Sequence, residues 1–184
     1  MRIGIDLMGS DSSPEFLFEA IEKISREVPE ATLIVFVTQY ALDSIYSLPK
    51  TYHQLKIGYC SRIEFQIVSE VIEMNDDPIE SFRLKKNSSI VLGLKLLKKN
   101  FLDAFVSSGN TGALITGATL SLPLLHEIKR PALLASFPTE NGNLTLLDVG
   151  GNVSCKSVNL IQFAQMGVAY QRSQEGIQRP RFGL

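Results

Sequence analysis

The chain is poor in the residues that build metal centres and disulfide frameworks. Its 184 residues include two cysteines, Cys60 and Cys155, and two histidines, His53 and His126, none of them at the spacing of a metal site. We therefore expect no zinc site and a reducing compartment, with both cysteines packed as small buried apolar side chains. Neither histidine is expected to belong to a metal cluster or a catalytic triad.

The chain also lacks an excess of either charge and any apolar run of membrane-spanning length. Its 18 Lys and Arg residues nearly balance 19 Asp and Glu residues, so the net charge of -1 does not draw it to nucleic acid or an anionic membrane. No apolar run approaches the roughly 20 residues of a transmembrane helix. Met1 leads directly into a predicted strand rather than a signal peptide, so we expect a cytoplasmic protein.

What remains is the pattern of an α/β protein. Residues 2–8 predict a strand, residues 14–28 a helix capped by Ser13, and residues 32–38 a strand buried on both faces. This right-handed β–α–β unit predicts a mostly parallel sheet. Further strands are predicted at 62–68, 104–106, 132–137, 144–149 and from 181, further helices at 40–47, 78–86, 90–99, 113–120 and 157–174, and a loop at 48–60.

The most informative stretch is residues 103–118, DAFVSSGNTGALITGA. A buried apolar strand is expected to turn through small polar residues into a helix. The free N–H groups at the start of that helix, with its dipole, favour an anion. A capped turn without a ligand is the alternative. The candidate anion-binding residues are Ser107, Ser108, Gly109, Asn110, Thr111 and Gly112.

Two other predicted strands end in similar loops, at residues 9–11 and 148–152. Because the carboxyl ends of parallel strands lie on one edge of a sheet, we expect all three loops to meet there. Arg83, Lys85 and Lys86 precede a helix that a serine is expected to cap, so they would add positive charge; a solvated basic turn is the alternative. The chain has no Walker motif and no GxGxxG, which leaves a phosphate-type ligand as the prediction.

Five ordered segments resemble one known family: DLMGSD at 6–11, DDPIESFRLKKNSS at 76–89, SSGNTGAL at 107–114, RPAL at 130–133 and LLDVGGN at 146–152. They are similar to the bacterial phosphate acyltransferases of phospholipid synthesis. Leu7, Ser10, Ser108 and Gly151 depart from the usual family pattern, and Leu7 adds bulk. That family extends well beyond residue 184, so the resemblance implies that residues 1–184 are a single α/β acyltransferase domain whose C-terminal part is missing.

The resemblance implies a three-layer α/β/α fold with a mostly parallel sheet, like that of isopropylmalate dehydrogenase. It implies transfer of a fatty acyl group from acyl carrier protein to inorganic phosphate, with no cofactor and no metal. The implied partners are acyl carrier protein, phosphate and a second copy in a homodimer, with peripheral membrane contact through the missing part and no nucleic acid. The implied location is the cytoplasm, with membrane association.

For the site, the resemblance implies backbone N–H groups that stabilise an oxyanion and lysines that bind phosphate. The candidate catalytic residues are Lys85, Asn110 and Asn152, with either asparagine orienting the carbonyl. The residues expected to bind substrate are Gly9, Asp11, Arg83, Lys86, Ser88, Ser107, Ser108, Gly109, Thr111, Gly112 and Asp148.

Three alternatives remain open at this point. The first is a phosphotransacetylase-like enzyme that uses acyl-coenzyme A. The second is a decarboxylating dehydrogenase of the isopropylmalate type, which would need a metal-binding aspartate cluster that the sequence does not offer. The third is an inactive phosphate-binding fragment.

Overall fold

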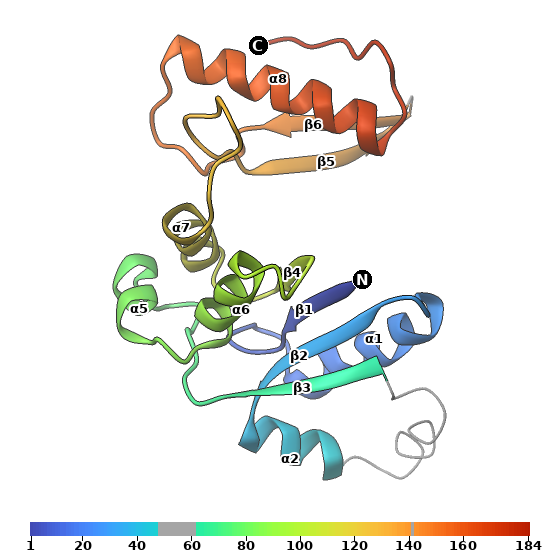
Figure 1. Ribbon diagram of the computed structural model, residues 1–184, viewed down its shortest axis with the longest axis vertical. Helices are drawn as coiled ribbons and strands as arrows, with labels where there is room; N and C mark the ends of the chain where they lie inside the picture. Colours follow the sequence, from blue (N-terminus) through green and yellow to red (C-terminus); the bar gives the residue numbers. More distant parts are fainter. Residues whose placement is uncertain (48–61, 141) are drawn as a thin grey trace. The chain divides into compact units, whose positions relative to one another are not determined.

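The computed structural model describes residues 1–47, 62–140 and 142–184, which form two compact units, residues 1–123 and 124–184 (Figure 1). Cys60, His53 and the predicted loop at 48–60 lie outside the described residues. The expectation of one acyltransferase domain over residues 1–184 stays a prediction.

The first unit is built on a parallel sheet of β1 (Arg2–Asp6), β2 (Thr32–Thr38), β3 (Ile63–Val68) and β4 (Ala104–Ser107). The strands lie in the order β3-β2-β1-β4, so β1 pairs with both β2 and β4. The predicted parallel sheet is confirmed for these strands. The carboxyl ends of β1 and β4 are neighbours, because Asp6 pairs with Ser107.

Five helices of this unit follow the predicted order: α1 (Pro14–Glu27), α2 (Gln39–Ser47), α5 (Pro78–Leu84), α6 (Ser89–Lys98) and α7 (Thr111–Ser121). The helices lie on both faces of the sheet (Figure 1), because successive side chains of β2 pack against helices on opposite faces. Val35 and Val37 face α1 and α2, whereas Phe36 faces α6. Each of these side chains is fully buried and contributes about 2 kcal/mol of transfer free energy.

The buried face of α1 differs from the apolar face that the sequence predicts, which is formed by Leu17, Ala20, Ile21, Ile24 and Val28. Ser13 caps the helix by accepting a hydrogen bond from the Phe16 N–H, as expected. However, Phe18 and Ile21 are buried while Ile24 is 43% exposed. Phe18 packs on Phe65 of β3, with ring centroids 5.7 Å apart, whereas Ile24 lines an open hollow together with Val106 of the edge strand β4.

The strand before the central loop was expected to be buried, and this is wrong for the described chain. β4 is an edge strand whose only partner among the described strands is β1, and Val106 is 54% exposed. An apolar sequence is compatible with either position, because periodicity reports hydrophobicity and not the number of neighbouring strands.

The second unit pairs β5 (Leu134–Thr139) with β6 (Gly142–Leu147) as an antiparallel hairpin, which α8 (Ser157–Gln174) covers. The two strands and the helix predicted for this region are confirmed, with each strand displaced by two residues. The predicted apolar face of α8, formed by Leu160, Ile161, Ala164 and Val168, is wrong in part. Phe163 and Gln171 are buried there, whereas Ile161 is 60% exposed, because a two-stranded sheet covers only a narrow stripe of the helix.

Three further expectations concern Cys155, the C-terminal residues and membrane-spanning helices. Cys155 is exposed in the loop before α8, so it is not the buried apolar residue expected. Residues 181–184 are not a strand, because their backbone joins no ladder among the described residues. Among the helices that the structure describes, none combines the length and apolarity needed to cross a bilayer.

Candidate functional site

Loops from distant parts of the sequence meet at the carboxyl ends of β1 and β4, and two glycines allow their close approach. Gly9 has a φ of +67°, and a Cβ there would lie 2.0 Å from the carbonyl oxygen of Ile72. A Cβ on Gly109 would lie 2.9 Å from the carbonyl oxygen of Met8. The loop after β1 therefore contacts both the turn at residues 70–77 and the loop between β4 and α7.

Asn110 connects the turn at residues 70–77 to the start of α7. Its Oδ1 accepts a hydrogen bond from the Ala113 N–H at 2.9 Å and caps the helix. Its Nδ2 lies 3.0 Å from the carbonyl oxygen of Glu73, 3.3 Å from that of Met74 and 3.2 Å from that of Asp76. This buried amide is therefore committed to holding the turn at residues 70–77 against the start of α7.

The N-terminus of α7 keeps N–H groups that no protein acceptor takes. Within the described residues, the N–H groups of Thr111 and Gly112 have no hydrogen-bond partner. Thr111 is exposed, and Ser108 beside it is exposed as well. Because the α7 dipole places partial positive charge at the same point, this turn is suited to bind an oxyanion.

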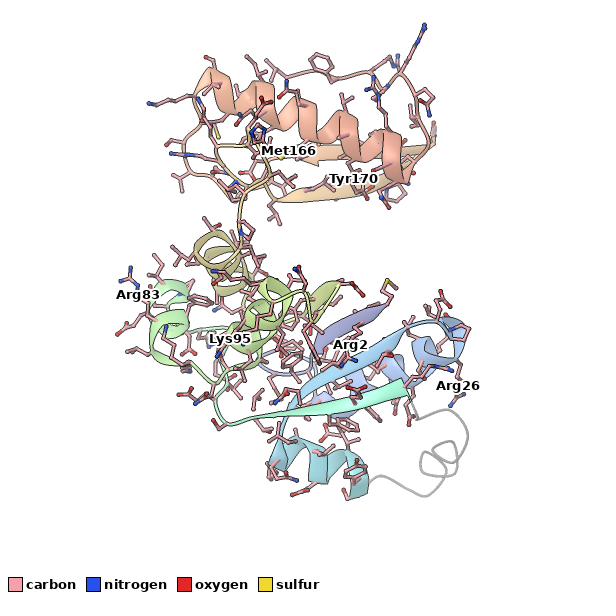
Figure 2. All side chains as sticks on the ribbon, viewed as in Figure 1. Arg2, Arg26, Arg83, Lys95, Met166 and Tyr170 are labelled. Atoms are coloured by element: carbon pink, nitrogen blue, oxygen red, sulfur yellow. The ribbon has the colours of Figure 1, made fainter. Side chains whose placement is uncertain are left out.

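The basic cluster divides into one paired and two exposed cations. Lys85 Nζ lies 2.5 Å from Asp76 Oδ2 and 2.7 Å from the carbonyl oxygen of Val71. The hydrogen bond from Lys85, helped by the Glu73 N–H, holds the pKa of the Asp76 carboxyl below its ordinary value. Arg83 and Lys86 are exposed, and Arg83 extends away from α5 (Figure 2).

Ser88 makes no side-chain cap for α6, so the expected serine cap does not form. It occupies the N-cap position and is fully buried, but its side chain caps no helix N–H. Its hydroxyl instead donates to the carbonyl oxygen of Lys85 at 2.8 Å. The hydroxyl takes this acceptor because the chain bends back between α5 and α6, which places the Lys85 carbonyl within its reach.

Asp6 is a residue of the site that the sequence reasoning missed. Its side chain is 2% exposed and accepts hydrogen bonds from the Met8 N–H and the Ser107 hydroxyl, each at 2.8 Å, and from Ser89. Burial raises the pKa of the Asp6 carboxyl above its ordinary value, although these hydrogen bonds oppose the shift. An aspartate that closes an otherwise apolar strand was the available signal.

The loop at residues 148–152 does not follow a strand of the parallel sheet, so the expectation that it shares a sheet edge with the other two loops is wrong. It follows β6, which is antiparallel to β5 in the separate hairpin of the second unit. Asp148 accepts from the N–H groups of Leu133, Gly151 and Asn152. Asn152 Nδ2 donates to the carbonyl oxygen of Pro131 at 2.9 Å.

The hydrogen bonds of this loop decide the ionisation of Asp148. Partial burial raises the pKa of its carboxyl, but the hydrogen bonds from Leu133, Asn152 and Gly151 outweigh burial and bring the pKa below its ordinary value. Asp148 is therefore a charged anchor that ties the loop to Leu133, the residue just before β5.

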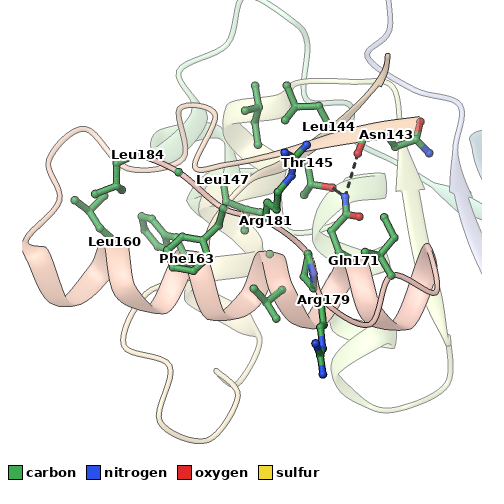
Figure 3. A pocket seen from close by; sticks show the side chains of 18 of the residues that line it. Asn143, Leu144, Thr145, Leu147, Leu160, Phe163, Gln171, Arg179, Arg181 and Leu184 are labelled. Carbon is green, nitrogen blue, oxygen red and sulfur yellow. Dashed lines mark hydrogen bonds between the residues drawn. The ribbon is translucent and has the colours of Figure 1, made fainter. Parts of the chain in front are cut away.

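The second unit also carries a hollow that the sequence reasoning did not foresee. Its volume is about 550 Å³, and it lies between β6, α8 and the segment at residues 177–184 (Figure 3). Leu144 and Phe163 give it apolar walls, and Arg179 and Arg181 line it as well. The Gln171 amide closes one end by donating to Thr145 Oγ1 at 2.5 Å.

Comparison with known proteins gives one consistent result. Over residues 1–184 the chain matches the family described as "Fatty acid synthesis protein". It is 40% identical over 184 residues to proteins named phosphate acyltransferase from Caldanaerobacter subterraneus and Thermoanaerobacter pseudethanolicus, and 36% identical over 187 residues to one from Staphylococcus haemolyticus. Each match covers 100% of this chain and 52% of the relative, so the chain spans about half the length of these relatives. Because the match extends over every residue, the chain belongs to the fatty acid synthesis protein family.

Proposed function

We propose that this chain contributes the phosphate-binding part of an enzyme that transfers a fatty acyl group from acyl carrier protein to inorganic phosphate, giving acyl phosphate. The observation that carries the proposal is the pair of N–H groups of Thr111 and Gly112, which no acceptor among the described residues takes, at a helix start that Asn110 clamps in place. The names of the relatives, phosphate acyltransferase, agree with this chemistry.

The reaction asks for positioning more than for acid–base catalysis. A phosphate oxygen attacks the thioester carbonyl carbon, the new C–O bond forms, and the carbonyl oxygen becomes an oxyanion. When the oxyanion collapses, the C–S bond breaks and the carrier leaves as a thiolate, whose conjugate acid has a pKa of about 8.5. Such a leaving group needs no strong acid, so holding phosphate against the carbonyl accounts for most of the protein's work.

Within this proposal the cations have different roles. Arg83 and Lys86 are exposed and attract phosphate, while the Lys85 ammonium adds charge to the site although it also pairs with Asp76. Gly9, Asp11, Ser88 and the residues from Ser107 to Gly112 shape the pocket. Asn110 holds the loop that faces the carbonyl. Asp148 and Asn152 stay predicted site residues.

Several broader features belong to the same proposal. The full protein would have the isopropylmalate-dehydrogenase-like arrangement of the sheet, act as a homodimer and receive its substrate from acyl carrier protein. It would work in the cytoplasm, with peripheral membrane contact. The dehydrogenase alternative is disfavoured because no three His, Cys, Asp or Glu side chains among the described residues converge as a metal site.

An activity assay tests the proposal. This chain, and a version extended by the second half of the domain, would be given acyl carrier protein loaded with a fatty acyl group and inorganic phosphate. Acyl phosphate formed by the extended version supports the proposal. Activity with acyl-coenzyme A alone would favour a phosphotransacetylase, and phosphate binding without turnover in either version would favour an inactive binding protein.

A further inference from the structure

Asp6 lies beneath the anion-binding turn without being part of its surface. It ends β1, and its side chain is 2% exposed, so it does not reach solvent or a ligand directly. A carboxylate this deeply buried is retained only if its hydrogen bonds compensate for the lost hydration. Its partners therefore indicate what the group does.

Those partners form a relay into the turn. The Ser107 hydroxyl donates to Asp6 Oδ2 at 2.8 Å, and the Gly109 N–H donates to Ser107 Oγ at 3.2 Å. Because its hydrogen points to the carboxylate, the Ser107 hydroxyl presents a lone pair to Gly109. Asp6 thereby sets the orientation of the hydroxyl, and the hydroxyl sets the orientation of the Gly109 peptide.

Gly109 is buried, and a Cβ there would lie 2.9 Å from the Met8 carbonyl oxygen, so packing limits its position while the hydrogen bond to Ser107 Oγ sets the direction of its N–H. The Gly109 peptide lies between Ser108, which is exposed, and Asn110, whose amide holds the turn at residues 70–77. Because the chain continues from this peptide into α7, a change in the orientation of the Gly109 peptide would redirect the N–H groups of Thr111 and Gly112. Anion binding needs those N–H groups to converge.

We propose that Asp6 is a positioning residue for the oxyanion turn, acting through Ser107 on the Gly109 peptide. The inference rests on the proposed function, because it assigns Asp6 a role in binding the phosphate that the reaction uses. Asp6 touches neither phosphate nor the acyl group. Its effect is to preorganise the N–H groups of residues 108–112, which lowers the entropy lost when phosphate binds.

Phosphate titration of the 184-residue chain tests the inference, with the backbone amides of residues 108–112 followed by NMR. Asp6→Asn keeps the size of the side chain but offers one acceptor oxygen in place of two, so it cannot serve Met8 and Ser107 together. We expect the phosphate Kd to rise about tenfold in Asp6→Asn and in Ser107→Ala, as for the loss of a hydrogen bond to a charged group. The double variant should be no weaker than Asp6→Asn, because both changes break one relay.

Two further variants separate positioning from stability. Ser107→Thr keeps the hydroxyl and should restore phosphate affinity to within about twofold of the parent, whereas a loss of packing would not be rescued in this way. Ser25→Ala removes another buried hydroxyl, which donates to the carbonyl oxygen of Glu22 at 2.8 Å, and should leave phosphate affinity unchanged. If Asp6→Asn does not fold, the comparison of Ser107→Ala with Ser107→Thr decides the question.

The inference and the proposed function fail in different ways. A parent chain whose amides at 108–112 do not respond to phosphate overturns the proposed phosphate site, and with it the role given to Asp6. A parent that binds phosphate, with Asp6→Asn and Ser107→Ala binding equally well and an unchanged Gly109 amide signal, overturns the positioning role alone.

Discussion

Lys85 and Asp76 form an ion pair with 2.5 Å between Nζ and Oδ2, across the turn that Asn110 also holds. The same ammonium group donates to the carbonyl oxygen of Val71 at 2.7 Å. A lysine that was predicted from the sequence to bind phosphate therefore also has a structural partner. The neighbouring Lys86 is exposed, and its ammonium group lies 3.4 Å from the carbonyl oxygen of Phe82 and 5.8 Å from the centroid of the Phe82 ring.

The two lysines should separate in mutational tests. Lys85→Ala should lower the thermal midpoint as well as phosphate affinity, since it removes the ion pair and leaves the Val71 carbonyl without its partner. Lys86→Ala should weaken phosphate binding and leave the thermal midpoint close to that of the parent. Lys95→Ala, at an exposed position on α6, is the control for loss of a lysine charge. Unchanged phosphate affinity in both Lys85→Ala and Lys86→Ala would show that neither lysine binds phosphate, leaving Lys85 as a structural residue and Lys86 as a solvated one.

Gly9→Ala should be strongly destabilising, and Gly176→Ala much less so. Both glycines have positive φ, +67° and +68°, which costs an alanine about 1 kcal/mol. Only at Gly9 would the new Cβ meet the Ile72 carbonyl, at 2.0 Å, whereas nothing lies within 4 Å at Gly176. Denaturant unfolding should therefore show a loss of more than about 2 kcal/mol for Gly9→Ala. Equal losses for the two variants would show that the contact between the loops is unimportant.

Asn110→Ala should cost about 2–3 kcal/mol of unfolding free energy, because it removes a helix cap and the buried amide that donates to the carbonyl oxygens of residues 73–76. Asn110→Asp keeps the cap to the Ala113 N–H but loses the donor to Glu73 and Asp76. Ser13→Ala, which removes the cap of α1 alone, should cost only about 1 kcal/mol. If Asn110→Ala loses no more unfolding free energy than Ser13→Ala, the hydrogen bonds from Asn110 to residues 73–76 do not contribute to stability.

The loop at residues 148–152 should lose stability in acid. The pKa of Asp148 is lower in the folded chain than its ordinary value of 3.8, so the folded state binds fewer protons than the unfolded state. The stabilisation is therefore present above pH 3.8 and is lost as the pH falls through the lowered folded value. The thermal midpoint of the parent should fall more steeply in acid than that of Asp148→Asn. Parallel pH curves for the two proteins would contradict this assignment.

The pKa shift of Asp6 has the opposite sign to that of Asp148, so the two carboxyl groups should affect stability in opposite directions of pH. The pKa of Asp6 is raised above 3.8, so its folded state binds more protons. The corresponding stabilisation is present below pH 3.8 and is lost as the pH rises through the folded value. A titration that follows each carboxyl carbon by NMR distinguishes the two groups directly.

The sequence alone was sufficient for the local structure and the family. Alternating and continuous apolar runs placed β1, β2 and β3, and the Ser13–Pro14 pair placed the start of α1, because strand period, helix caps and proline geometry are local properties. The order of the loop motifs also indicated the family that the comparisons show. These features depend on residues close together in the chain.

Tertiary structure decided which of those residues meet. Only the fold shows that Lys85 pairs with Asp76, that Asn110 holds residues 73–76, and that Asp148 and Asn152 belong to a hairpin outside the parallel sheet. It also brings Asp6 under Ser107, although 101 positions separate them in the sequence. Hydrogen bonds and ion pairs act over a few ångströms in space, whereas a sequence pattern records only neighbours along the chain. The loops of this site were therefore predictable one by one, and the contacts that hold them together were not.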